Sequence, residues 1–117
     1  MPTIQQTNIQ TQIDNVRCTR WAALLNADDG ASIPFGQYTD KSVQVFGTFG
    51  AGGTLLLEGS NDGTNWATLT DPQGNPLSFT AAKIEQIMEA TLHVRPRVSA
   101  GDGTTSLTAI VLMKETR

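Results

Sequence analysis

The chain has 117 residues, of which 38% are hydrophobic and 16% are charged, and its formal net charge is −3. This length suffices for one domain with one modest core, and so small a net charge argues against disorder driven by charge repulsion. The 8 Lys and Arg are outnumbered by 11 Asp and Glu, which argues against nucleic acid as the main partner, because phosphate binding requires clustered basic side chains. The 16 Thr and 11 Gly suit pleated surfaces and turns, so the composition favours strands.

Residues 1–15 are polar, and we expect them to form an extended N-terminal arm. Their large apolar side chains are Ile4, Ile9 and Ile13, whose spacings of five and four residues fit neither a helix nor a strand. Such an arm becomes ordered either by lying on a neighbouring subunit as an added strand or by folding back on its own sheet. It lacks the basic and apolar regions of a secretory signal, and no apolar run could span a bilayer, so we expect synthesis in the cytoplasm and no membrane contact.

Residues 16–117 are predicted to form a single all-β domain, a β-sandwich of jelly-roll-like type. About eight short strands separated by turns are typical of this architecture. Two glycine-containing connections, 50–53 and 100–103, predict β-hairpins between the strands that flank them. Apolar or alternating runs predict strands or extended pieces over residues 16–26, 33–38, 42–49, 54–60, 66–70, 77–80, 92–99 and 104–114.

Residues 81–90 are the one segment predicted to be helical. Ile84, Ile87 and Met88 follow the i, i+3, i+4 spacing of an amphipathic helix, and Thr80 is a plausible N-cap. A helix of this length would act as a connector or a lid on the sandwich.

Candidate catalytic and metal-binding groups are few. The chain has one histidine, His93, and one cysteine, Cys18, so neither a nucleophile with its base nor a thiol metal cluster is indicated. We expect His93 to be exposed and structurally neutral and Cys18 to be a small buried hydrophobe. The pairs Asp62-Gly63 and Asp102-Gly103 are interpreted as turns, with Asp accepting N–H groups and Gly taking a positive φ, and not as calcium loops. The sequence thus predicts no enzyme activity, cofactor or metal.

Arg95 and Arg97 flank Pro96, whose missing N–H predicts that this strand lies at a sheet edge or a bulge. Two interpretations of the arginines remain open. They line a solvated edge with carboxylate partners such as Glu85 or Glu89, or they form a contact face, because the planar guanidinium pairs a carboxylate with two bonds.

The two tryptophans differ in their surroundings. Trp21 lies in an apolar run and is expected in the core. Trp66 directly follows a dense turn cluster, where it would either pack in the core or serve as a platform on which a sugar stacks.

Five runs follow one another in the second part of the chain: VFGTFG at 45–50, LEGSNDGTNW at 57–66, LTDPQGNPL at 69–77, VRPRV at 94–98 and GDGTT at 101–105. In their order and spacing they resemble small structural proteins of tailed phages and prophages. The resemblance covers roughly residues 43–112, and it rests on order and spacing, since Ser-Asn-Asp-Gly followed by Trp also occurs in discoidin-like carbohydrate-binding sandwiches.

The resemblance implies a virion component, and we expect a capsid decoration (cement) protein on the outer surface of the head. Its partners would be the major capsid protein, whose subunits it bridges, and itself, as a homodimer or homotrimer assembled in the bacterial host. No catalytic residues come with the resemblance. We expect the contacts to be the arm isoleucines Ile4, Ile9 and Ile13 together with Arg95 and Arg97. The alternatives are a neck or tail structural protein of the virion, or a carbohydrate-binding module that uses Trp66.

Overall fold

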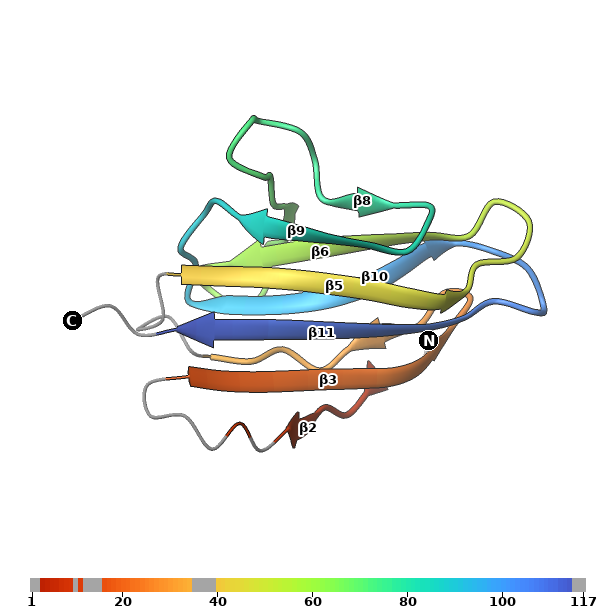
Figure 1. Ribbon diagram of the computed structural model, residues 1–117, viewed down its shortest axis with the longest axis horizontal. Coiled ribbons are helices and arrows are strands. Elements are labelled where there is room, and N and C mark those ends of the chain that lie inside the picture. Colours follow the sequence, from red (N-terminus) through yellow and green to blue (C-terminus); the bar gives the residue numbers. More distant parts are fainter. Residues whose placement is uncertain (1–2, 10, 12–15, 35–39, 115–117) are drawn as a thin grey trace.

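The computed structural model describes residues 3–9, 11, 16–34 and 40–114, which form strands in two stacked sheets and no helix (Figure 1). The prediction of an all-β sandwich is therefore confirmed. In chain order the strands are β1 (Thr3–Ile4), β2 (Thr7–Ile9), β3 (Val16–Leu25), β4 (Asp29–Gly30), β5 (Asp40–Thr48), β6 (Thr54–Ser60), β7 (Ala67–Thr68), β8 (Ser78–Phe79), β9 (Lys83–Ile87), β10 (His93–Ala100) and β11 (Ser106–Lys114).

The strand order is that of a jelly roll. Sheet A runs β1-β4-β10-β6-β7, with β8 also paired to β6, and sheet B runs β2-β3-β11-β5-β9. Strands β7 and β8 lie on the same side of β6 and act as one edge. Apart from the arm strands β1 and β2, the chain then alternates between sheets at almost every connection, so that each sheet has four positions, as in a double Greek key. Sheet B is the nearer layer in Figure 1.

The two predicted hairpins are wrong, because both connections cross from one sheet to the other. β5 belongs to sheet B and β6 to sheet A, and β10 and β11 are divided in the same way. An alternating strand buries one face whether its successor pairs with it or lies across the core, so alternation cannot distinguish the two cases. Positive φ angles at Gly47, Gly50 and Gly52 turn the chain out of sheet B at this point.

The two crossing loops bind each other through Asp102. Its carboxylate accepts the N–H of Ala51 at 2.9 Å and the N–H of Thr104 at 2.9 Å, and the hydroxyl of Thr105 donates to the carbonyl of Phe49 at 2.8 Å. These donors, Ala51 first and Thr104 next, lower the pKa of Asp102 to about 2. Asp102 therefore acts as a turn former, as predicted, but Gly103 does not take the predicted positive φ.

Replacing Asp102 by Asn is expected to lower stability at neutral pH and to flatten its acid dependence. The folded pKa of about 2 lies below the ordinary value of 3.8, so the ionised carboxylate stabilises the folded chain above pH 3.8. That contribution disappears as the pH falls through about 2. Urea midpoints measured through this range would test it, and equal acid slopes for the variant and the parent would contradict it.

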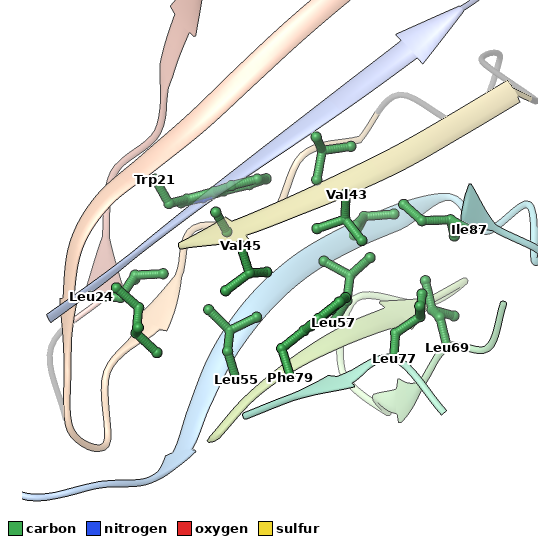
Figure 2. Packing of buried hydrophobic residues seen from close by; sticks show 14 of the residues in the cluster. Trp21, Leu24, Val43, Val45, Leu55, Leu57, Leu69, Leu77, Phe79 and Ile87 are labelled. Carbon is green, nitrogen blue, oxygen red and sulfur yellow. The ribbon is translucent and has the colours of Figure 1, made fainter. Parts of the chain in front are cut away.

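The core lies between the sheets (Figure 2). Trp21 is fully buried, as predicted, and its indole N–H donates to the carbonyl of Ala31 at 2.9 Å. Cys18 is also buried, as predicted, but it lies outside the core cluster, opposite Leu112 of β11, and burial raises the pKa of its thiol. The other members of the core cluster are Leu24, Ile33, Val43, Val45, Leu55, Leu57, Leu69, Leu77, Phe79, Ile87, Val94, Val98, Leu107, Ala109, Val111 and Met113.

The predicted helix at 81–90 is wrong, because this segment contains strand β9. The strand pairs antiparallel with β5. The three apolar residues at helical spacing do not share one buried face. Ile87 is buried, whereas Ile84 and Met88 are each 61% exposed. The β-branched isoleucines fit a pleated strand, and pairing along the edge of sheet B outweighs the local 3.6-residue pattern.

The prediction that Pro96 marks an edge or a bulge is also wrong, because β10 lies between β4 and β6 and pairs in register at Pro96. Opposite Pro96, Leu57 donates its N–H to Leu77 and accepts one from Leu69, on the side away from β10. The Pro96 nitrogen therefore faces β4. Because β4 has only two residues, the N–H that Pro96 lacks would face a strand that makes few hydrogen bonds with β10 in any case.

The described part of the arm lies on the chain's own sheets. β1 pairs parallel with β4 at the edge of sheet A, and β2 pairs antiparallel with β3 at the edge of sheet B. The arm thus covers the seam between the sheets on one side. Ile4 packs against the core, and Ile9 is half-buried opposite Cys18. Ile13 and residues 35–38 of the predicted extended piece lie outside the described residues.

Candidate functional site

The outer face of sheet A carries an ion-pair cluster, which we define as Asp29, Glu58, Arg95 and Arg97. Register places Arg95 of β10 directly opposite Glu58 of β6. The Nε of Arg95 donates to Glu58 Oε1 at 3.0 Å, and the Nε of Arg97 donates to Oε2 at 3.0 Å. Arg95 Nη1 also lies 3.5 Å from Asp29 Oδ2. One carboxylate therefore orients both guanidinium groups.

The partners expected for these arginines, Glu85 and Glu89, are wrong. Glu85 lies in β9 and Glu89 comes just after it, so both belong to the other layer of the sandwich. Each has a partner of its own. Glu85 forms an ion pair with Lys83 at 2.8 Å, and Glu89 accepts the backbone N–H of Thr70 at 2.8 Å and also its hydroxyl. The true partner Glu58 is 37 residues away from Arg95 in the sequence.

The cluster is balanced in charge and closely packed, with Glu58 only 5% exposed. Both Glu58 oxygens are used by Nε donors, so the terminal nitrogens of Arg97 have no hydrogen-bond partner within the described residues. The Arg97 side chain is 32% exposed. A guanidinium held through Nε presents its terminal nitrogens in the fork that binds a carboxylate with two bonds. The arrangement can therefore bind an acidic side chain of another molecule.

Trp66 lies over this face, and the prediction that it packs in the core is wrong. The Arg95 guanidinium carbon stands 4.1 Å from the centre of the Trp66 ring, within the range of a cation–π contact. The His93 ring lies beside it, with 6.4 Å between ring centres and a tilt of 57°. Arg95 thus occupies one of the two ring faces on which a sugar would stack. The prediction that His93 is exposed is wrong, because its ring lies against Trp66 and its Nδ1 is buried, with no hydrogen-bond partner among the described residues.

The Asp62 turn lies at the end of β6, and the prediction of turn chemistry is confirmed there. Its carboxylate accepts the N–H groups of Thr64 and Asn65, both at 2.8 Å, and the hydroxyl of Ser60 at 2.9 Å. The donors from Asn65 and Thr64 hold the pKa of Asp62 well below its ordinary range. Gly63 takes the positive φ. Within the described ranges, no three His, Cys, Asp or Glu side chains could hold a metal ion.

Sequence reasoning missed a buried lysine in β5. Lys41 is 3% exposed, and burial lowers its pKa while the nearby carboxylates of Asp40 and Glu89 oppose that effect. The alternation of β5 contains the signal, because position 41 falls on the same face as Val43 and Val45. Lys41 and Glu89 place charge at one end of the sandwich, where the Thr70 segment is attached to the end of β9.

No helix among the described residues is long and apolar enough to cross a membrane. Comparison of the sequence with protein-family models and with curated proteins gives no match. The fold defines the chain as a jelly-roll β-sandwich. Among solved structures it is similar to the crystal structure of the SPBc2 prophage-derived protein YomS, with a TM-score of 0.63 and 12% sequence identity over 89% of this chain and 98% of that one. At this identity the likeness shows a shared fold.

Proposed function

We propose that this chain is a non-enzymatic structural protein of a tailed-phage particle, and more specifically a decoration protein on the outer surface of the head. The observation that carries the proposal is the likeness of fold, over nearly the whole of both chains, to a prophage-derived protein. The order and spacing of the sequence runs over residues 43–112 support the same class of protein independently of the fold. Jelly rolls are also common in capsid proteins, although the fold alone does not assign a function.

The mechanism would be mass action. A protein that binds only the assembled shell stabilises it by its binding free energy, and a decoration protein repeats this at many equivalent sites. Bridging adjacent major capsid subunits would raise the barrier to rupture of a filled head. This role requires a rigid body with a defined contact surface and no cofactor.

The contact surface that we favour joins the arm to the arginine pair. The Thr3 hydroxyl in β1 donates to Asp29 at 3.1 Å, and Asp29 in turn lies beside Arg95. The arm and the ion-pair cluster are therefore one continuous surface. Arg97 offers its terminal nitrogens there, so an acidic side chain of the major capsid protein would be its partner.

The copy number in purified particles tests the assignment. Quantitative mass spectrometry against the major capsid protein is expected to find hundreds of copies per particle. A count of about six or twelve would favour a neck or tail ring, and absence from particles would overturn the virion assignment. A change of Trp66 fluorescence on addition of sugars would favour a carbohydrate-binding module.

Replacing Arg97 by Glu is expected to lower occupancy of the shell by at least roughly tenfold, because it puts a carboxylate where the partner's carboxylate binds. Lys83→Glu is the matched control, since it makes the same change in charge in β9 of the other sheet, away from the arginine pair. Occupancy would be measured on particles that lack the protein, after adding it back. Equal occupancy for both variants would exclude the arginine surface but not the virion assignment.

A further inference from the structure

The outer face of sheet B differs in character from that of sheet A. Among the described residues six large hydrophobic side chains are exposed, and four of them point outward from this one face: Leu25, Phe46, Ile84 and Leu112. Register confirms that they share a side, because Phe46 lies opposite Thr108, Ile84 opposite Gln44, and Leu112 opposite Ser42. With the half-buried Ile110 they form what we call the apolar face. Figure 1 looks onto it.

The other surfaces of the sandwich are already covered or satisfied. The arm closes one seam between the sheets. At the other seam, the Met88 N–H following β9 donates to the carbonyl of Thr70, so the chain after β7 lies alongside. On sheet A, the acidic and basic side chains of the ion-pair cluster neutralise one another. Apart from the terminal nitrogens of Arg97 on sheet A, the apolar face is thus the broad surface in the described structure whose chemistry lacks a complement.

We propose that this face binds a second copy of the chain and forms a twofold-symmetric dimer. From strand spacing and rise, the face of sheet B offers roughly 600 Å² per copy. Two copies would bury roughly 1,200 Å², which is near the lower limit for specific, stable interfaces. Exposed Arg20 and Gln44 flank Ile110 within the face, and a mixture of apolar side chains with arginine is the composition of such an interface.

The border charges select the orientation of the two copies. Asp40 and Lys114 lie opposite each other in register at one end of the face. A twofold axis that runs along the strands, between β5 and β11, places Lys114 across from the partner's Asp40 and Asp40 across from the partner's Lys114. An axis along β11 itself would bring the two Lys114 side chains together, which is unfavourable.

The same axis gives Leu112 a place to bind. It places Leu112 opposite the partner's Ser42. Ser42 lies in a shallow hollow of about 280 Å³ on this face, with Asp40, Lys41, Gln86, Leu112 and Lys114 as the other lining residues. An apolar side chain that fills a hollow on the partner is typical of the residues that contribute most to binding. Leu112 is therefore the expected anchor.

Light scattering coupled to size-exclusion chromatography tests the dimer with the full chain. The parent is expected at twice the chain mass of 12.5 kDa. Leu112→Lys should weaken association by roughly 100-fold, because it places a charge in a hollow that the interface would close to water. Leu92→Lys is the matched control, since Leu92 is 48% exposed, against 41% for Leu112, and lies off the face; it should remain dimeric. A monomeric parent up to millimolar concentration, or a dimeric Leu112→Lys, would overturn the proposal.

A charge-exchange experiment does not depend on the folding of the Leu112 variant. Asp40→Lys opposes two lysines across the proposed interface, and Lys114→Asp opposes two aspartates, so each variant alone should dimerise roughly tenfold more weakly. Mixed in equal amounts, the two should form heterodimers, because every facing pair is then opposite in charge. A mixture no more dimeric than its components would contradict the orientation and the proposal.

The proposed dimer does not depend on the phage assignment, because dimerisation is measured on the free protein. A monomeric parent whose Leu112→Lys variant loses shell binding would overturn it and assign the apolar face to the capsid instead. Absence of the protein from particles would leave the dimer unaffected.

Discussion

Replacing Glu58 by Ala is expected to lower the free energy of unfolding by about 3 kcal/mol. Glu58 is 5% exposed, and it is the acceptor for the Nε groups of both Arg95 and Arg97. Without it, two partly buried guanidinium groups lose their shared partner, and only Asp29, at 3.5 Å from Arg95, remains near them. Removal of one member of a buried charged network costs more than the network contributes as a whole, because the remaining charges stay desolvated.

Urea denaturation of the parent and the variant measures this effect. Glu85→Ala is the control, because its ion pair with Lys83 lies at an edge where the lysine side chain is 61% exposed, and it should change stability by no more than about 0.5 kcal/mol. Glu58→Gln keeps the shape of the side chain and should fall between the two. Similar losses for Glu58→Ala and Glu85→Ala would mean that water already screens the cluster.

Much of the strand layout was predictable, because alternation and turn residues are local. The strand expected at 54–60 corresponds to β6, and those expected at 16–26 and 42–49 correspond closely to β3 and β5. Burial of Trp21 followed from the apolar run in which it lies, and burial of Cys18 followed from its residue type. Asp62 formed a turn as predicted, because its partners lie within three residues of it.

The sheet assignment of each strand was not predictable, because it depends on contacts between distant residues. The wrongly predicted hairpin at 50–53 is held in its crossing path by Asp102, about half the chain away. The strand β4 is only two residues long, and its sequence, Asp29-Gly30, is typical of a turn. It becomes a strand only because β1 and β10 lie on either side of it.

The candidate site was half predictable for the same reason. The spacing of Arg95 and Arg97 places them on one face of a strand whatever the fold. Their acceptor depends on β10 lying beside β6 in a register that puts Arg95 opposite Glu58. The apolar face could not be predicted for the same reason. Phe46 and Leu112 each fit the alternation of an ordinary sandwich strand, and they share a face because β5 pairs with β11.

Replacing Gly30 by Ala is expected to lower the free energy of unfolding by about 2 kcal/mol. A Cβ at this position would stand 2.6 Å from Trp21 Cδ1 and 2.7 Å from two ring carbons of Pro96. Neither ring can move easily, since Trp21 is fully buried and hydrogen-bonded to Ala31 and Pro96 is held in the centre of sheet A. Gly103→Ala is the matched control, because a Cβ there meets nothing within 4 Å.

The cause of the Gly30 effect can be isolated with Pro96→Ala. If the steric conflict is with the proline ring, the double variant should be more stable than the sum of the two single changes predicts, with a coupling of about 1 kcal/mol. Additive losses would assign the conflict to Trp21 alone, and a shift in Trp21 fluorescence would then accompany Gly30→Ala. A loss no larger than that of Gly103→Ala would contradict both. The expected coupling would instead show that Gly30 and Pro96 form one structural unit, in which a residue without a side chain allows a proline in a central strand.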